Sequence, residues 1–106
     1  MEQDLLVITN LKNELIYQYC AADKEDKKTQ LLLLAYASLD IFKEVRAEQT
    51  QYFYYSIDKF MYHNVSLLLM PSGYKIVFVH EWKDRDWVFG LLKTIHSIFL
   101  KVSSFL

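Results

Sequence analysis

The residues that could do chemistry in this chain are a pair of acids and three histidines. Asp40 and Glu44 are four positions apart and share one face of a predicted helix. Acid–base catalysis needs two carboxylates in a cleft with different pKa values, and a helix surface provides neither. His63, His80 and His96 fall on different predicted elements, and none has a second metal ligand at a recognised spacing. We therefore expect structural histidines, no metal site, and an acid pair that is solvated or lies in an interface.

Cofactors and nucleic acid are also disfavoured as ligands. Two glycines, Gly73 and Gly90, cannot build a phosphate-binding loop, and a net charge of −1 gives no basic field for a phosphate backbone. The single cysteine, Cys20, excludes a disulfide framework and is expected to be a small buried residue on a strand. A small-molecule pocket around His80 stays open as an alternative, although no nucleophile accompanies this histidine in the sequence.

The composition bounds the class of protein. The chain has 106 residues, of which 53% are hydrophobic and 16% aromatic, so it fits one domain over residues 1–106 with a sizeable core. No apolar run reaches the roughly 18 residues that a membrane-spanning helix needs. The acidic start, Met1–Asp4, lacks the basic region of a signal peptide. We expect a cytoplasmic, non-enzymatic protein without a transmembrane segment.

Five strands and two helices are predicted, in the order β-β-α-β-β-β-α. Runs of β-branched and aromatic residues bounded by turn residues predict the strands, and a long segment without Gly or Pro predicts the first helix. The strands span residues 5–9, 14–21, 52–60, 65–70 and 74–80, and the helices span residues 26–48 and run on from near residue 87. The first, fourth and fifth strands are the most apolar and should be central. This predicts an α+β fold with a five-stranded antiparallel sheet, order 2-1-5-4-3, and one helix on each face.

Each helix has one apolar stripe that should face the sheet. In the first helix the stripe is Leu31, Leu34, Ala35, Ser38, Phe42 and Val45, and in the second it is Val88, Leu91, Ile95, Ile98, Val102 and Phe105. Asp84 or Asp86 is expected to cap the second helix. The apolar end, Phe105-Leu106, is expected to dock on the fold or to lead to a third helix that this sequence lacks.

The first helix carries more apolar residues than its stripe uses. Leu33, Ala37 and Ile41 step by four along another face, and Asp40 and Glu44 border them. An apolar strip rimmed by acids has the composition of a protein contact surface, the alternative being cover by a loop of the same chain. We predict a protein-interaction site at these five residues. The unpaired edges of the sheet offer a second route to a partner.

Three stretches of the sequence resemble the sedlin family. Tyr36–Glu44 is similar to the family's first-helix motif, in which a small residue precedes Leu-Asp and an acid follows. Ser56–Phe60, with the strands that follow it through Glu81, resembles the family's strand block, and Leu5–Tyr19 fits its opening hairpin. Asp58-Lys59-Phe60 favours sedlin over the sedlin-like paralogue, which shares the Leu-Asp pair. The resemblance covers nearly the whole chain.

The resemblance implies a longin-like (profilin-like) fold and a non-catalytic adaptor subunit of TRAPP. This complex tethers vesicles between endoplasmic reticulum and Golgi and acts as a nucleotide-exchange factor for a Rab-type GTPase. The implied partners are the other TRAPP subunits, both the small core and the larger peripheral ones, with the Rab-type GTPase as an indirect partner. The implied location is cytoplasmic, peripherally associated with ER and Golgi membranes through the complex. Asp40 matches the family's aspartate on a partner-binding surface.

The family pattern also departs from this sequence at one end. Sedlin-type chains continue with an Asn-Pro-Phe segment and a further helix, whereas the match here ends at Lys101–Leu106. We expect either a reduced homologue or a truncated chain. A longin-type trafficking module outside TRAPP, of the adaptin-like or SNARE-regulatory kind, is the main alternative.

Overall fold

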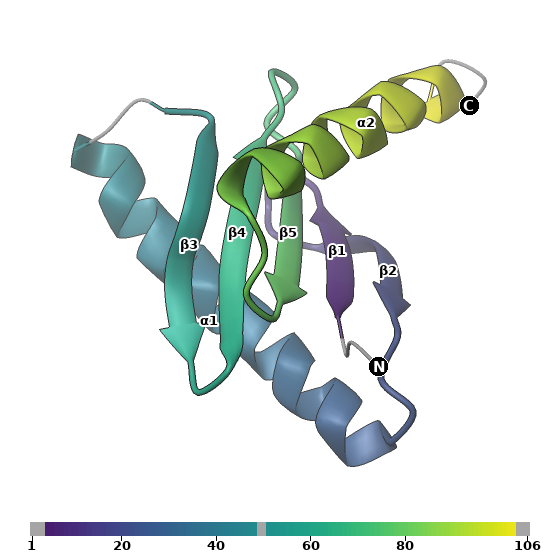
Figure 1. Ribbon diagram of the computed structural model, residues 1–106. Helices are drawn as coiled ribbons and strands as arrows, with labels where there is room; N and C mark the ends of the chain where they lie inside the picture. The colour runs from purple at the N-terminus through teal and green to yellow at the C-terminus, as the bar shows by residue number, and fades with distance from the viewer. Residues whose placement is uncertain (1–3, 49–50, 104–106) are drawn as a thin grey trace.

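The computed structural model describes residues 4–48 and 51–103 and shows a twisted sheet between two helices (Figure 1). The elements in chain order are β1 (Leu5–Thr9), β2 (Leu15–Cys20), α1 (Glu25–Glu48), β3 (Phe53–Phe60), β4 (His63–Leu69), β5 (Lys75–His80) and α2 (Arg85–Ser103). The sheet order is β2-β1-β5-β4-β3, and all four neighbouring pairs are antiparallel. The predicted longin-like α+β fold and the strand order 2-1-5-4-3 are therefore confirmed.

Burial explains why the strands take these places. Every residue of β5 is buried, as are the first six of β4, because helices cover both faces of the sheet there. β2 is mostly exposed and forms one edge, and β3, which carries Asp58 and Lys59, forms the other. A continuous apolar run needs cover on both faces, whereas charges are tolerated where one face or edge meets water.

Two hairpin turns form as their residue types predict. In the turn between β1 and β2, the Asn10 side chain accepts hydrogen bonds from the N–H groups of Lys12 and Glu14, and Asn13 adopts a φ of 61°. Asn tolerates this left-handed conformation better than most residues. In the turn between β4 and β5, the N–H of Gly73 donates to the carbonyl of Met70 at 2.9 Å.

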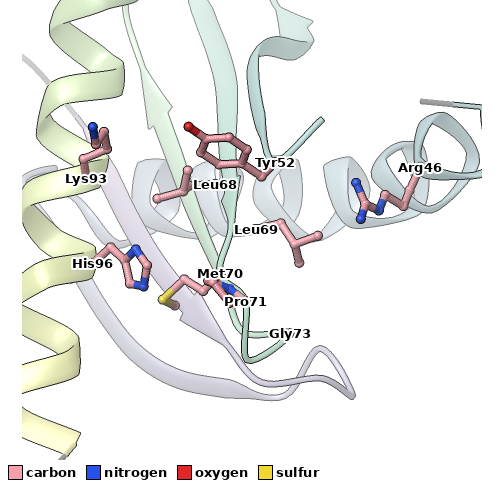
Figure 2. A pocket seen from close by; sticks show the side chains of 9 residues that line it. All are labelled: Arg46, Tyr52, Leu68, Leu69, Met70, Pro71, Gly73, Lys93 and His96. Atoms are coloured by element: carbon pink, nitrogen blue, oxygen red, sulfur yellow. The ribbon is translucent and has the colours of Figure 1, made fainter. Parts of the chain in front are cut away.

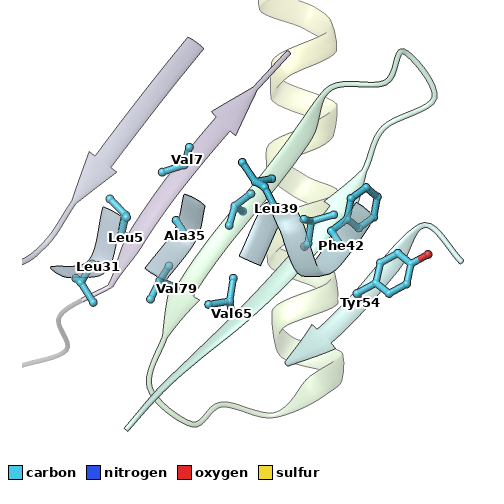
Figure 3. Packing of buried hydrophobic residues seen from close by; sticks show 11 residues of the cluster. Leu5, Val7, Leu31, Ala35, Leu39, Phe42, Tyr54, Val65 and Val79 are labelled. Carbon is cyan, nitrogen blue, oxygen red and sulfur yellow. The ribbon is translucent and has the colours of Figure 1, made fainter. Parts of the chain in front are cut away.

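α1 covers one face of the sheet. Its predicted stripe is confirmed at Leu31, Ala35, Ser38 and Phe42, which are buried, while Leu34 and Val45 are half-buried. Leu39, which the stripe omitted, is also buried. Figure 3 shows Leu31, Ala35, Leu39 and Phe42 against side chains of the sheet, and the rings of Phe42 and Tyr54 pack edge to face at a centroid distance of 5.4 Å. Burying each leucine contributes roughly 1.5–3 kcal/mol to folding.

α2 covers the other face, but only with its first half. Asp84 caps the helix, since its carboxylate accepts hydrogen bonds from the N–H groups of Asp86 and Trp87. Val88 and Leu92 are fully buried, and Leu91 and Ile95 are half-buried.

The predicted stripe is wrong for the second half of α2. Ile98 and Val102 are exposed, and Phe99 packs on the sheet instead. α2 packs against β3 and β4, and its last turns extend past the centre of the sheet, so helical spacing alone places these residues wrongly (Figure 1). Phe105 and Leu106 lie outside the described residues.

In β2 the more polar face is less exposed to solvent than the face that carries the tyrosines. Tyr17 and Tyr19 are exposed, whereas Gln18 and Cys20 are half-buried. Cys20 lies on a strand and packs against the apolar cluster under α1, but it is half-buried rather than buried as expected. The tyrosines lie on the α2 side of the sheet, where Tyr17 lines a hollow together with residues of the second half of α2.

Candidate protein-interaction site

The predicted interaction residues form what we call the α1 strip, on the side of α1 that faces away from the sheet: Leu33, Ala37, Asp40, Ile41 and Glu44. Leu33 is 64% exposed, and Ala37, Asp40 and Glu44 are also exposed, while Ile41 is half-buried. This arrangement follows from the helix period, because residues two positions after each buried contact point outward. No described segment covers Leu33 or Ala37, so cover by a loop of the same chain is not observed among residues 4–48 and 51–103.

A hollow lies beside Leu33, between the first half of α1 and the turn that joins β3 to β4. Its volume is about 490 Å³, which is within the range of binding pockets. The lining residues are Lys27, Gln30, Leu31, Leu33, Leu34, Phe60, Met61, Tyr62 and His63. The lining contains no acid, and Lys27 and Gln30 form its polar border on the helix. We call this hollow the hairpin groove.

The turn between β3 and β4 contributes three large, exposed apolar side chains to the groove. Phe60 is 64% exposed, Met61 71% and Tyr62 78%. Isolated exposed apolar residues are ordinary, but a cluster of four that includes Leu33 is typical of a protein contact surface. Aromatic residues and methionine are enriched at the centres of such surfaces.

Met61 also has a strained backbone. Its φ is 56°, and Phe60 pairs with His63, so Met61 and Tyr62 are the two central residues of a tight hairpin turn. Such turns favour Gly or Asn at positions of positive φ, because a side chain there costs roughly 1–2 kcal/mol. A large, exposed apolar residue at a position that disfavours it supports a role in contact rather than in stability.

Only part of the α1 strip belongs to the cluster of exposed apolar side chains at the hairpin groove. Leu33 belongs to both, whereas Ala37, Asp40 and Glu44 continue along the outer face of α1 and do not line the groove. The sequence did contain a signal for the missed residues. Phe60-Met61-Tyr62 places three apolar residues where a hairpin turn normally has small or polar ones.

A second hollow of about 460 Å³ lies near the turn between β4 and β5 (Figure 2). Arg46 borders it from α1, and Lys93 and His96 border it from α2. In Figure 2 Arg46 lies on the opposite side from Lys93 and His96, so these groups do not converge on one point. The Arg46 guanidinium already donates to the carbonyl of Gln51 at 2.6 Å. This hollow therefore lacks the arrangement of an anion site.

The structure corrects the expectation that no nucleophile accompanies His80. The hydroxyl of Ser66 lies 2.8 Å from Nε2 of His80, a distance found in serine–histidine pairs that perform nucleophilic catalysis. However, both side chains have zero exposure, so a substrate cannot reach them. The same burial removes the support for a small-molecule pocket centred on His80.

The hydrogen bonds around His80 define its protonation. Nδ1 lies 2.7 Å from the carbonyl of Glu81, which can only accept, so Nδ1 carries the proton. Nε2 then accepts from the hydroxyl of Ser66, whose oxygen accepts from the N–H of Ser56 at 3.1 Å. Burial lowers the pKa of His80 below its usual value, partly offset by the Glu81 carbonyl and the charge of Asp4. A neutral His80 satisfies the network, which is structural.

In residues 4–48 and 51–103 there is no group of three His, Cys, Asp or Glu side chains that could hold a metal ion. Neither α1 nor α2, as far as the chain is described, is long and apolar enough to cross a membrane.

The fold and the exposed surfaces of residues 4–48 and 51–103 together define a longin-like domain that presents apolar contact surfaces. Comparison with known families gives a match to the family model described as Sedlin over residues 8–104. The chain therefore belongs to the sedlin family, a non-enzymatic family of TRAPP-type trafficking subunits. A search of the curated proteins found no significant match.

Proposed function

We propose that this chain is a non-catalytic adaptor subunit of the TRAPP vesicle-tethering complex and acts in vesicle-mediated transport from endoplasmic reticulum to Golgi. The observation that carries this proposal is the sedlin family match over residues 8–104. The partners are other TRAPP subunits, small and large, and a Rab-type GTPase is reached only indirectly, through the complex. The chain works in the cytoplasm and associates with ER and Golgi membranes through that complex.

The proposed mechanism is docking of a partner subunit on the α1 strip. Leu33 and Ala37 supply exposed apolar area, and Ile41 extends it as a half-buried residue. Asp40 and Glu44 are exposed acids on the same side of the helix and would set orientation and partner choice. Because neither acid takes part in the packing of α1 on the sheet, their substitution should affect binding more than folding.

The test is an affinity pull-down of the tagged chain from its own cells, followed by mass spectrometry. We expect other TRAPP subunits with the wild-type chain and a loss of at least one of them with Asp40→Tyr. Asp86→Tyr is the matched control, because Asp86 is an exposed aspartate on α2, on the opposite face of the sheet. Thermal melting should show both variants folded.

Three outcomes would count against the proposal. Recovery of coat or SNARE proteins instead of TRAPP subunits would support a longin-type module outside TRAPP. Recovery of TRAPP subunits unchanged by Asp40→Tyr would keep the complex but remove the docking surface from α1. A sharp fall in melting temperature with normal binding of the folded fraction would make Asp40 a structural residue.

A further inference from the structure

The ladder between β1 and β2 shows which backbone groups of β2 face outward. The N–H of Ala21 donates to the carbonyl of Asp4 at 2.9 Å, which marks this pair as hydrogen-bonded. In an antiparallel ladder hydrogen-bonded and non-hydrogen-bonded pairs alternate. The register between Ala21 and Tyr17 is unbroken, and Tyr19 and Tyr17 lie two and four positions before Ala21. Both tyrosines therefore also belong to hydrogen-bonded pairs and direct their N–H and C=O groups toward β1.

The residues between the tyrosines direct their backbone groups the other way. The N–H and C=O groups of Gln18 and Cys20 point to the outer side of β2, where the described chain has no further strand. Figure 1 shows β2 as the last strand on this side of the sheet. These groups form a template to which another strand can bind.

This edge carries no charge, and its residues Tyr17–Cys20 pair with β1 in unbroken register, although a bulge lies at Ile16. The segment Leu15–Cys20 contains no charge, no proline and no glycine. The opposite edge, β3, contains Asp58 and Lys59 and is bent by a bulge in which Ser56 has a φ of 52°. Charges and bulges are the usual protection of edge strands. β3 has both, whereas β2 has no charge and its bulge at Ile16 lies outside Tyr17–Cys20.

Exposed apolar side chains flank the open edge on the α2 face. Tyr17 is 51% exposed and Tyr19 61%. Beside them is a hollow of about 490 Å³ whose lining has no charged residue: Leu6, Ile8, Ile16, Tyr17, Ile95, Ile98, Phe99 and Val102. A strand added to β2 would bring its own side chains next to this apolar surface, as strand-addition complexes do.

We propose that β2 pairs antiparallel with β2 of a second copy of this chain, across a two-fold axis at Gln18. The strand is complementary to itself. In this register Gln18 faces Gln18 of the second copy, and their outward N–H and C=O groups bond each other. On the α2 face Tyr17 lies opposite Tyr19 of the second copy, and the reverse, which gives two aromatic cross-strand pairs.

Charge supports a second copy as the occupant. An uncharged strand meets no like charge when it pairs with itself, whereas β3 would bring Asp58 and Lys59 to the contact. The two-fold axis makes every favourable contact occur twice and closes the assembly at a dimer, because β3 at the far edge is protected. The dimer surface is on a different element from the α1 strip, so this proposal does not depend on the proposed function.

The test is sedimentation equilibrium of the purified full chain over a series of concentrations. We expect a dimer. Gln18→Pro removes an outward N–H and leaves the bonds to β1, so it should weaken dimerisation about tenfold or more without loss of the sheet. Gln18→Thr keeps the N–H and should dimerise like the wild type. A wild-type chain that stays monomeric at the highest concentration would overturn the proposal, as would a Gln18→Pro dimer of unchanged affinity.

A second variant decides the question if Gln18→Pro does not fold. Changing both Tyr17 and Tyr19 to Glu places two pairs of like charges opposite each other in the proposed register, and both positions are exposed. This variant should be a folded monomer by circular dichroism and sedimentation, whereas Tyr62→Glu, at the turn between β3 and β4, should remain a dimer. Equal dimerisation of the two variants would place the contact elsewhere and overturn the proposal.

Discussion

Replacing Met61 by glycine should strengthen the fold and weaken partner binding at the same time. Met61 has a φ of 56° and a side chain that is 71% exposed, so the side chain contributes little to the core and strains the turn. Glycine adopts this conformation without the steric cost. If the Met61 side chain contacts a partner, Met61→Gly should raise the free energy of unfolding and lower the affinity for that partner.

The size of the effect follows from two opposing terms. Relief of the left-handed strain stabilises the fold by about 1–2 kcal/mol, and the greater freedom of glycine in the unfolded chain offsets about 0.5–1 kcal/mol of this. The net gain is about 0.5–1 kcal/mol. With a urea m-value of about 1.5 kcal/mol/M, the unfolding midpoint should rise by about 0.3–0.7 M.

The matched control for this prediction is Tyr62→Gly. Tyr62 is the next residue of the same turn, is 78% exposed and is not among the residues of positive φ. Glycine there relieves no strain and should lower the free energy of unfolding by about 0.5–1 kcal/mol. The reasoning is refuted if urea titration shows Met61→Gly to be as destabilising as Tyr62→Gly. Both variants should bind the partner more weakly if the hairpin groove is part of the interface.

Three further predictions concern the buried network and the contact surface. Ser66→Ala leaves the N–H of Ser56 and Nε2 of His80 without their partner and should cost about 2–4 kcal/mol by urea titration, while the exposed Ser97→Ala should change stability by less than about 0.5 kcal/mol. The lowered pKa of His80 means that the unfolded chain binds a proton before the folded one does. Stability should therefore fall as the pH drops below about 6.5, by at most about 1.4 kcal/mol per pH unit, until the folded-state pKa is reached. His80→Gln should lose this part of the pH profile, and an unchanged profile would contradict a neutral, buried His80. Leu33→Ser should reduce partner affinity about tenfold in a titration and leave the melting temperature nearly unchanged.

The topology could be predicted because the apolar pattern of each strand shows how many of its faces must be buried. A strand that is apolar at every position, such as 75–80, needs cover on both faces, and the charges of Asp58 and Lys59 favour an edge. The second half of α2 could not be predicted in the same way. Helical spacing identifies an apolar face, but it does not show where the sheet beneath it ends, so Ile98 and Val102 were placed wrongly.

Only the part of the site that lies on a single helix could be predicted from the sequence. The α1 strip follows from the period of one helix, so Leu33 could be assigned to an outer face from sequence alone. The hairpin groove needs the packing of α1 beside the turn that holds Met61, which no periodicity encodes. The contact between Ser66 and His80 depends on the register of two strands and on which rotamers fill the core, and these are known only from the structure.

The most direct test of the central claim is site-specific photo-crosslinking from the α1 strip. A photoreactive phenylalanine replaces Ala37, an exposed small residue between Leu33 and Asp40, and crosslinked proteins from the chain's own cells are identified by mass spectrometry. The control places the same group at Thr94, an exposed residue of α2. We predict that the group at position 37 captures a TRAPP subunit and the group at position 94 does not. Equal capture from both positions, or capture of no TRAPP subunit from position 37, would contradict docking through α1.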